Sequence, residues 1–253
     1  MPLTSILVMA LAGLAAGILA GFLGIGGGVL MVPMLLMLGL DIDHATATSL
    51  LAILITASAG SWQNWRMGYL RPKQVLFLAA PAVCLVLIGT EVGGLMSDFL
   101  RQVSFGCLLL ANLYLVSLKK RAASTQPTPL SPNTSRLITG GAAGFMAGLF
   151  GVGGGVIMVP LQLLLLDTEI KQAVRNSLGV IVLTSLIACI HNSIKGDIVP
   201  LAGVLMGLGG LVGVQISTRF LPKLSEQIVT KLFRSLLVVL AAYVFWQAWS
   251  VSP

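Results

Sequence analysis

One glycine-rich motif occurs twice in this chain, and this duplication constrains the fold more than any other feature. Residues 21–33 read GFLGIGGGVLMVP and residues 148–160 read GLFGVGGGVIMVP, an offset of 127 residues. After a slip of one residue to 128, further positions match: Ser49-Leu50 with Ser177-Leu178, Asn64 with Asn192, Gly68 with Gly196 and Pro72 with Pro200. The chain is therefore a duplicated unit of about half its length.

Each unit divides into five apolar segments. They are residues 4–23, 29–40, 46–65, 74–96 and 101–118 in the first unit, and 137–150, 156–166, 173–194, 199–218 and 227–249 in the second. Prolines, serines and threonines are frequent in residues 119–136, which is typical of a linker. We expect a first membrane repeat at 1–118, a cytoplasmic linker at 119–136 and a second membrane repeat at 137–253.

Composition and segment length together indicate a membrane protein. Hydrophobic residues make up 57% of the chain and charged residues 9%, where a soluble domain carries about a quarter charged residues. The third to fifth segments of each unit can span a hydrocarbon core, which needs about 20 helical residues. The second segments are near half that length, and each follows helix-breaking glycines. We predict an all-α polytopic membrane protein whose repeats each contain a short Gly-broken helical hairpin plus about three spanning helices. Eight to ten full spans is the alternative.

The basic residues indicate how the two repeats are oriented. They cluster at 66–73, 119–136 and 219–234, and cytoplasmic loops are enriched in Lys and Arg. Placing all three clusters in the cytoplasm requires two inverted repeats. The acidic loop 41–43 then lies outside and the loop 167–175 lies inside. The apolar amino terminus reads as retained structure rather than a removed signal peptide.

Several function classes are disfavoured. Aromatic residues do not interleave with the basic clusters, so we expect no nucleic-acid partner. The three cysteines lie singly, and the chain has neither a zinc pair nor a nucleophile elbow, so we expect no metal site, no cofactor and no enzyme. The glycine clusters are not dinucleotide fingerprints, because Val29 stands where the third glycine would be.

The glycine clusters are the main candidate binding site. In transporters built from repeats, interrupted helices at matching positions mark a site near mid-bilayer. A helix that starts after such a cluster presents unpaired N–H groups and the positive end of its dipole, and glycine lets an anion approach. Two such starts would face each other across a shared anion site, unless the glycines serve only close helix packing. The candidates are Gly24, Gly26, Gly27, Gly28, Gly151, Gly153, Gly154 and Gly155.

Polar residues on the third segments are further candidates. Hydroxyls and amides there can donate to an anion without burying a full charge, although each alone could simply join two helices. These substrate-binding candidates are Thr48, Ser49, Asn64, Asn176, Ser177 and Asn192.

Three ionisable residues complete the set. Arg175 could draw an anion from the cytoplasm or serve as a positive-inside anchor. His191 could titrate near neutrality or be a structural hydrogen-bonder. Glu91 could relay a proton, as possible proton coupling, or could be only interfacial.

The doubled motif resembles that of the TauE/SafE family of sulfite exporters. The similarity rests on GIGGGVLMVP at 24–33 and GVGGGVIMVP at 151–160, and it extends over nearly the whole chain. It implies a multi-pass carrier of the bacterial inner membrane that moves sulfite, sulfonates such as sulfoacetate, or related sulfur anions, generally outward and without a nucleotide-driven subunit. The implied partners are a small anion and the lipid bilayer, and a possible homodimer is compatible with this reading.

Three functional hypotheses follow. The first is a secondary transporter that works by alternating access, with the repeats rocking about the glycine tips. The second is a passive anion channel, which would share the same composition and basic loops. The third is a membrane assembly or sensory subunit without transport of its own.

Overall fold

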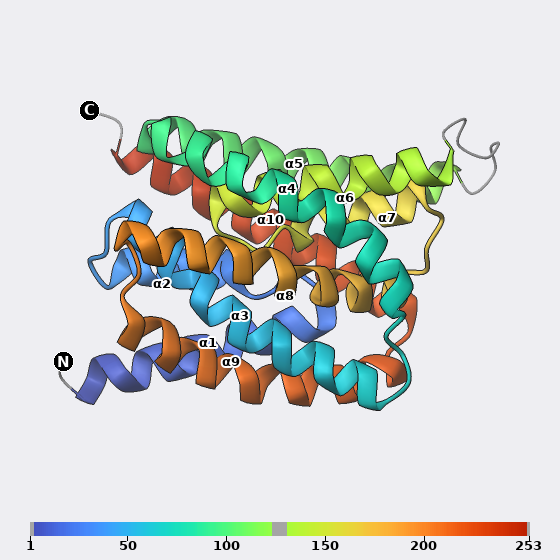
Figure 1. The fold of residues 1–253 in the computed structure, drawn as a ribbon, viewed down its shortest axis with the longest axis horizontal. Coiled ribbons are helices and arrows are strands. Elements are labelled where there is room, and N and C mark those ends of the chain that lie inside the picture. The colour runs from blue at the N-terminus through green and yellow to red at the C-terminus, as the bar shows by residue number, and fades with distance from the viewer. Residues whose placement is uncertain (1–2, 123–130, 252–253) are drawn as a thin grey trace.

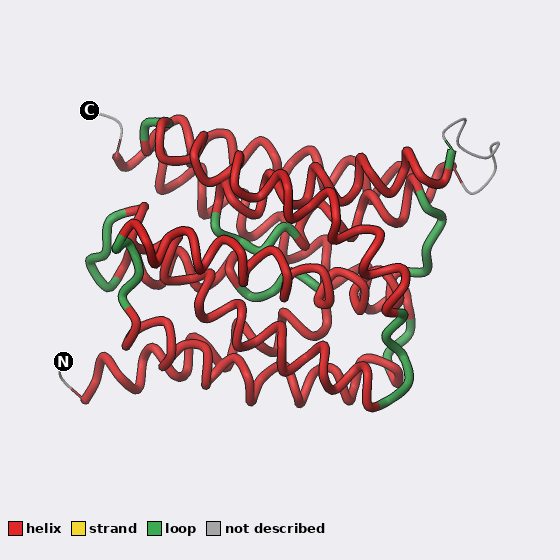
Figure 2. Tube along the Cα trace, viewed as in Figure 1, coloured by secondary structure: helices red, strands yellow, loops and turns green. Residues whose placement is uncertain are grey.

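The protein is almost entirely α-helical (Figure 2). The structure, a computed structural model, describes residues 3–122 and 131–251, and this part of the chain contains no strand. Its helices are α1 Leu3–Leu23, α2 Gly28–Met37, α3 Ile42–Arg66, α4 Pro72–Leu95, α5 Asp98–Ala122, α6 Pro132–Phe150, α7 Gly155–Leu165, α8 Ile170–Lys195, α9 Pro200–Phe220 and α10 Glu226–Val251, with a 3₁₀ turn at Leu221–Lys223. The all-α prediction is confirmed.

Seven of these helices are long and apolar enough to cross a membrane. They are α1, α3, α4, α5, α8, α9 and α10, whereas α2 and α7 have only 10 and 11 residues. The six segments predicted to span are all among the seven. The seventh is α1, which the sequence predicted as the first arm of a hairpin. The protein is therefore a multi-pass membrane protein.

The helices run roughly side by side, and the short ones return from the middle of the molecule (Figure 1). In Figure 1, α1 starts at the left, near the N-terminus, and α2 comes back to that end; α6 starts at the right, and α7 comes back to the right. The loops between α1 and α2 and between α6 and α7 lie near the centre (Figure 2). Both predicted hairpins therefore have their glycine tips in the interior of the bundle.

Two helix pairs hold the outside of the bundle together through glycine contacts. A β-carbon added at Gly17 of α1 would overlap the carbonyl oxygen of Gly210 in α9. Likewise, one added at Gly144 of α6 would overlap the carbonyl oxygen of Ala82 in α4. The first helix of each unit therefore packs along the fourth helix of the other, with backbones in close approach, as is common between helices in lipid. Helices α3 and α8 lie between these two pairs (Figure 1).

The helices begin and end at different residues from those expected. Helix α6 begins at Pro132, not at 137, because Ser131 caps it: its Oγ accepts a hydrogen bond from the Thr134 N–H at 3.2 Å. Helix α5 continues to Ala122, so the predicted linker at 119–136 is shorter at both ends. Its central residues, 123–130, lie outside the described part of the chain.

Helix α3 also begins before the expected residue 46, again because of a cap. The Asp41 carboxylate accepts from the backbone N–H groups of Asp43 and His44, at 3.1 and 3.0 Å. These contacts, with the His44 ring 2.8 Å away, lower the pKa of the Asp41 carboxyl below its usual value. Local capping residues are less visible in the sequence than the apolar run that follows them.

The close packing of α6 on α4 predicts unequal effects of two alanine substitutions. We expect Gly144→Ala to lower the melting temperature in detergent, because overpacking costs about 1–3 kcal/mol. Gly94→Ala in the last turn of α4 is the matched control, since a β-carbon there meets nothing within 4 Å. The measurement is thermal unfolding by circular dichroism, and a Gly144→Ala variant as stable as wild type would contradict the packing argument.

Loop accessibility tests which end of the bundle faces the cytoplasm. The connection from α4 to α5 lies at the left in Figure 1, and the one from the 3₁₀ turn to α10 lies at the right, with the basic clusters. In a variant without native cysteines, we expect Ser97→Cys to react with an impermeant maleimide added to intact cells. Ser225→Cys should react only after permeabilisation. Labelling in the reverse order would contradict the positive-inside assignment.

Candidate functional site

Each short helix starts directly after a glycine in the left-handed region. Gly27 precedes α2 with φ 87°, and Gly154 precedes α7 with φ 73°; neither helix start has a side-chain cap. Side chains rarely adopt such positive φ values, so these positions favour glycine. The repeated motif thus codes for two tight turns into a helix, as the sequence predicted.

The two glycine tips touch each other. A β-carbon on Gly155 would overlap the carbonyl oxygen of Gly24, and one on Gly28 would lie 2.8 Å from the Cα of Val152. Ile53 of α3 and Ile181 of α8 pack against both tips, within 3.4 Å of where β-carbons on the central glycines would lie. All eight candidate glycines are buried. The structure therefore brings both clusters together as predicted, but aliphatic side chains fill the space around them.

The backbone at each tip keeps unused hydrogen-bond donors. Gly27 O accepts from Leu30 N and Met31 N, both at 3.1 Å, as the first bonds of α2. Within the described residues, the N–H groups of Gly28 and Val29 make no such bond. The start of α7 has the same pattern, so both tips carry the donors and the positive dipole end that an anion site requires.

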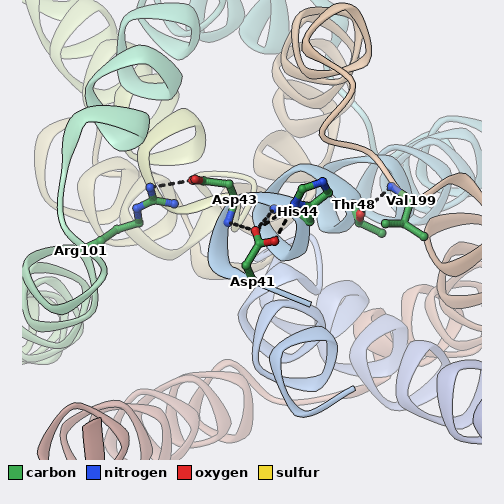
Figure 3. Close-up of polar contacts among 6 residues, drawn as sticks. All are labelled: Asp41, Asp43, His44, Thr48, Arg101 and Val199. Carbon is green, nitrogen blue, oxygen red and sulfur yellow. Dashed lines mark hydrogen bonds and ion pairs between the residues drawn. The ribbon is translucent and has the colours of Figure 1, made fainter. Parts of the chain in front are cut away.

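Among the hydroxyl candidates, Ser49 reaches a tip and Thr48 does not. The Ser49 Oγ–H lies 2.7 Å from the carbonyl oxygen of Gly151 and 2.7 Å from that of Thr46. The Oγ1 of Thr48 instead accepts from the Val199 N–H at 3.0 Å, where the chain enters α9 (Figure 3). Ser49 therefore links α3 to the tip of the other unit, and Thr48 positions a loop.

Asn176 and Ser177 belong to a buried amide network at the start of α8. The Asn176 Nδ2 group donates to Gln162 Oε1 at 3.0 Å and to Gln74 Oε1 at 3.2 Å. Gln172 Nε2 donates to Asn176 Oδ1 at 2.8 Å, and Gln162 Nε2 donates to Ser177 Oγ at 3.2 Å. The three glutamines were not predicted as site residues, although Gln162 is a lone amide in the apolar helix α7.

Arg175 lies beside this network and is nearly buried. Only 8% of the surface of this residue is exposed. Its guanidinium lies over the Tyr69 ring, 4.1 Å from the ring centre. Among the described residues, its Nε has no hydrogen-bond partner. A buried arginine with an unused donor is costly in lipid, so Arg175 remains a candidate for the functional site.

Arg101 was not predicted, and it is the most deeply buried cation of the opposite end. It is 4% exposed; its Nη2 donates to Asp43 Oδ1 at 2.8 Å (Figure 3) and also to the carbonyl oxygen of Gly93. Its Nε has no partner in the described residues. The available sequence signal was a basic residue close to Asp98 and outside the three basic clusters.

Arg101 lines two adjoining cavities of about 110 and 50 Å³, which both also include Thr46. The larger one extends from Asn192 to Gly148, three residues before the second glycine tip. Such a volume holds several water molecules or a small anion. We call the larger one the outer cavity, because it lies at the end opposite the basic loops; the smaller one reaches Val29 and Val152 at the tips.

The remaining candidates are spread over both ends. Glu91 Oε1 lies 2.7 Å from His191 Nε2 and accepts from Lys195 Nζ at 2.7 Å, which joins α4 to α8. Asn192 donates to Ala188 O at 2.7 Å and lines the outer cavity. Asn64 is fully buried, and neither of its side-chain polar atoms has a partner in the described chain. The candidates thus form a central group at the tips and two flanking groups.

Curated proteins similar to this chain share one description. A "Probable membrane transporter protein" of Xylella fastidiosa is 26% identical over 265 residues, covering 99% of this chain and 98% of that protein. A protein of the same description from Haemophilus influenzae is 34% identical over 186 residues, covering 69% of this chain and 68% of its own length. The "Probable membrane transporter protein YdhB" of Bacillus subtilis is 30% identical, covering 82% and 88%.

The descriptions of these relatives agree with the multi-pass helical fold of this chain, and they indicate a membrane transporter rather than an enzyme. The family model described as "Sulfite exporter TauE/SafE" matches residues 9–244, which include both glycine tips and all the buried cations discussed above. The chain therefore belongs to the TauE/SafE family.

Proposed function

We propose that this membrane transporter exports small sulfur-containing anions such as sulfite or organosulfonates. The observation that carries the proposal is Arg101, a buried cation that lines the outer cavity close to a glycine tip and whose Nε has no partner in the described residues. Such a group needs an anionic partner, and its Asp43 partner uses only one of its nitrogens. The family description supports the sulfur oxyanion as the substrate class.

The proposed path runs from the cytoplasmic end to the outer cavity. Arg175 and the amide network of Asn176 receive the anion on the inner side, because amides and guanidinium groups donate to oxyanions. The free N–H groups at Gly28 and Gly155 hold it between the tips. Arg101 receives it on the outer side. Each stage offers hydrogen-bond donors to the anion.

We further propose that the two units form inverted repeats that work by alternating access. Three observations support this: α1 and α6 start at opposite ends, each packs along the fourth helix of the other unit, and both glycine tips meet at the centre (Figure 1). In the present conformation the tips are in contact and the cavity lies on the outer side. Rocking of the units about the tips would separate them and expose their N–H groups.

The membrane potential is sufficient to drive export. An inside-negative potential contributes about 2.3 kcal/mol per charge per 100 mV toward exit of an anion. Glu91, in contact with His191 and Lys195 across α4 and α8, is the proposed position for proton coupling if a proton is also moved. The alternative is that these contacts only link α4 to α8. Glu91→Gln separates the two roles, because only coupling predicts a changed pH dependence of transport.

A passive anion channel is the second candidate, because the outer cavity is already open to one side. Proteoliposomes loaded with sulfite, thiosulfate, sulfoacetate, sulfate or a simple carboxylate distinguish the two. We expect efflux of sulfite or an organosulfonate to saturate with concentration and to be accelerated by the same anion outside, as for a carrier. Efflux that rises linearly without counterflow would indicate a channel, and efflux of none of the sulfur anions would contradict the substrate class.

Two substitutions of one ion pair should change anion affinity in opposite directions. We expect Arg101→Gln to weaken sulfite or sulfonate binding by roughly 10- to 100-fold, since a hydrogen bond to a charged group contributes about 1.5–3 kcal/mol. Asp43→Asn keeps Arg101 but removes the competing carboxylate, so affinity should stay equal or rise.

Binding can be measured as the shift of the melting temperature with anion concentration, because a ligand that binds only the folded protein raises it. Each variant is compared with its own anion-free sample, which separates a loss of binding from a loss of stability. Equal losses in both variants would show that the ion pair has only a structural role and that Arg101 does not contact the anion.

A further inference from the structure

A second polar cavity lies at the basic end of the bundle, away from the glycine tips. It has a volume of about 350 Å³ and opens between the last turns of α3 and α9, lined by Ala59, Trp62, Gln63, Arg66, Met67, Gln215 and Arg219. None of these residues belongs to the proposed anion path. The cavity is three times as large as the outer cavity and needs a separate explanation.

Two arginines give this cavity its charge. Arg66 ends α3 and Arg219 is in the last turn of α9, and both side chains are exposed. Within the described residues, neither makes a hydrogen bond or ion pair; the polar contact in the wall is Gln63 Nε2 donating to Gln215 O at 2.9 Å. The cavity therefore presents two guanidinium groups and no carboxylate.

The corresponding positions of the other unit carry an acidic residue that this cavity lacks. In the 128-residue register, Arg219 corresponds to Glu91 and Gln63 corresponds to His191. At the outer end, Glu91 contacts His191 and Lys195, so positive and negative groups neutralise each other within the protein. At the basic end the acid is replaced by Arg219, so the positive charge has to be neutralised from outside the chain.

The surroundings of the cavity are apolar and exposed. Trp62 and Trp65 are 60% and 54% exposed, and their ring centres are 5.2 Å apart. Ile216 and Phe220 continue the exposed apolar surface along α9. Exposed tryptophans near the ends of spanning helices lie at the level of lipid headgroups. The two arginines thus lie at the level of the membrane where the lipid headgroups join the acyl chains.

We propose that this cavity binds the phosphate of an anionic phospholipid from the cytoplasmic leaflet. Arg66 and Arg219 contact the phosphate oxygens, since guanidinium groups bind phosphate with paired hydrogen bonds. The acyl chains lie along Trp62 and the exposed face of α9. Basic pockets between helices on the cytoplasmic side favour anionic headgroups. A free phosphate would use the same arginines but would gain nothing from the apolar surface.

Native mass spectrometry of the purified full-length protein tests this site. The probes are phosphatidylglycerol, phosphatidylcholine and inorganic phosphate, each titrated in neutral detergent. We expect phosphatidylglycerol to bind at least tenfold more tightly than phosphatidylcholine. The Arg66→Gln/Arg219→Gln variant should bind it roughly 30-fold more weakly, which corresponds to the loss of two surface charge contacts.

The matched control is Arg71→Gln/Lys73→Gln, which removes two exposed charges at the same end but outside the cavity. It should keep wild-type affinity. If the double arginine variant does not fold, Arg219→Glu serves instead, because it introduces the acid of the matching unit beside Arg66 and should also abolish tight binding. Equal weakening in control and variant, equal binding of both lipids, or tight binding of inorganic phosphate alone would each overturn the lipid assignment.

Discussion

The contact between the two glycine tips is the interaction on which the rest of the structure depends. Backbone that leaves the helix inside a membrane must be enclosed by protein, because lipid offers no hydrogen bonds. Here each tip is enclosed by the other tip and by Ile53 and Ile181 from the two central helices. Only glycine allows the Gly155 and Gly24 backbones to approach so closely. The pair of α1 and α9 and the pair of α4 and α6 then cover the two tips from opposite sides.

The duplicated scaffold carries different polar groups in its two units. Asn176 and Gln162 form a buried amide network in one unit, where Thr48 and Leu35 stand in the other. The ends also differ in charge, since the acid Glu91 corresponds to Arg219. Packing is therefore shared between the units, whereas these polar and charged groups are not.

Much of the fold was predictable from the sequence because it depends on composition and spacing. The apolar runs predicted the helices, and the doubled GxGGG motif predicted two interior breaks, both confirmed in type and place. Helix starts were less predictable: the caps at Ser131 and Asp41 extend α6 and α3 beyond the apolar run. The candidate site was predicted only in part. Arg101 was missed because its ion pair with Asp43 of α3 joins residues 58 positions apart in the sequence.

The sequence by itself determined that this protein is a duplicated, helical membrane protein with two glycine breaks, since lipid solvation and helix length act locally along the chain. The tertiary structure alone decided which residues meet. It placed the Ser49 hydroxyl against the opposite tip and opened cavities at two separate places. It also left the Nε of Arg101 and of Arg175 without a partner among the residues that the structure describes. These features arise from contacts between helices far apart in the chain, and no local pattern of residues encodes such contacts.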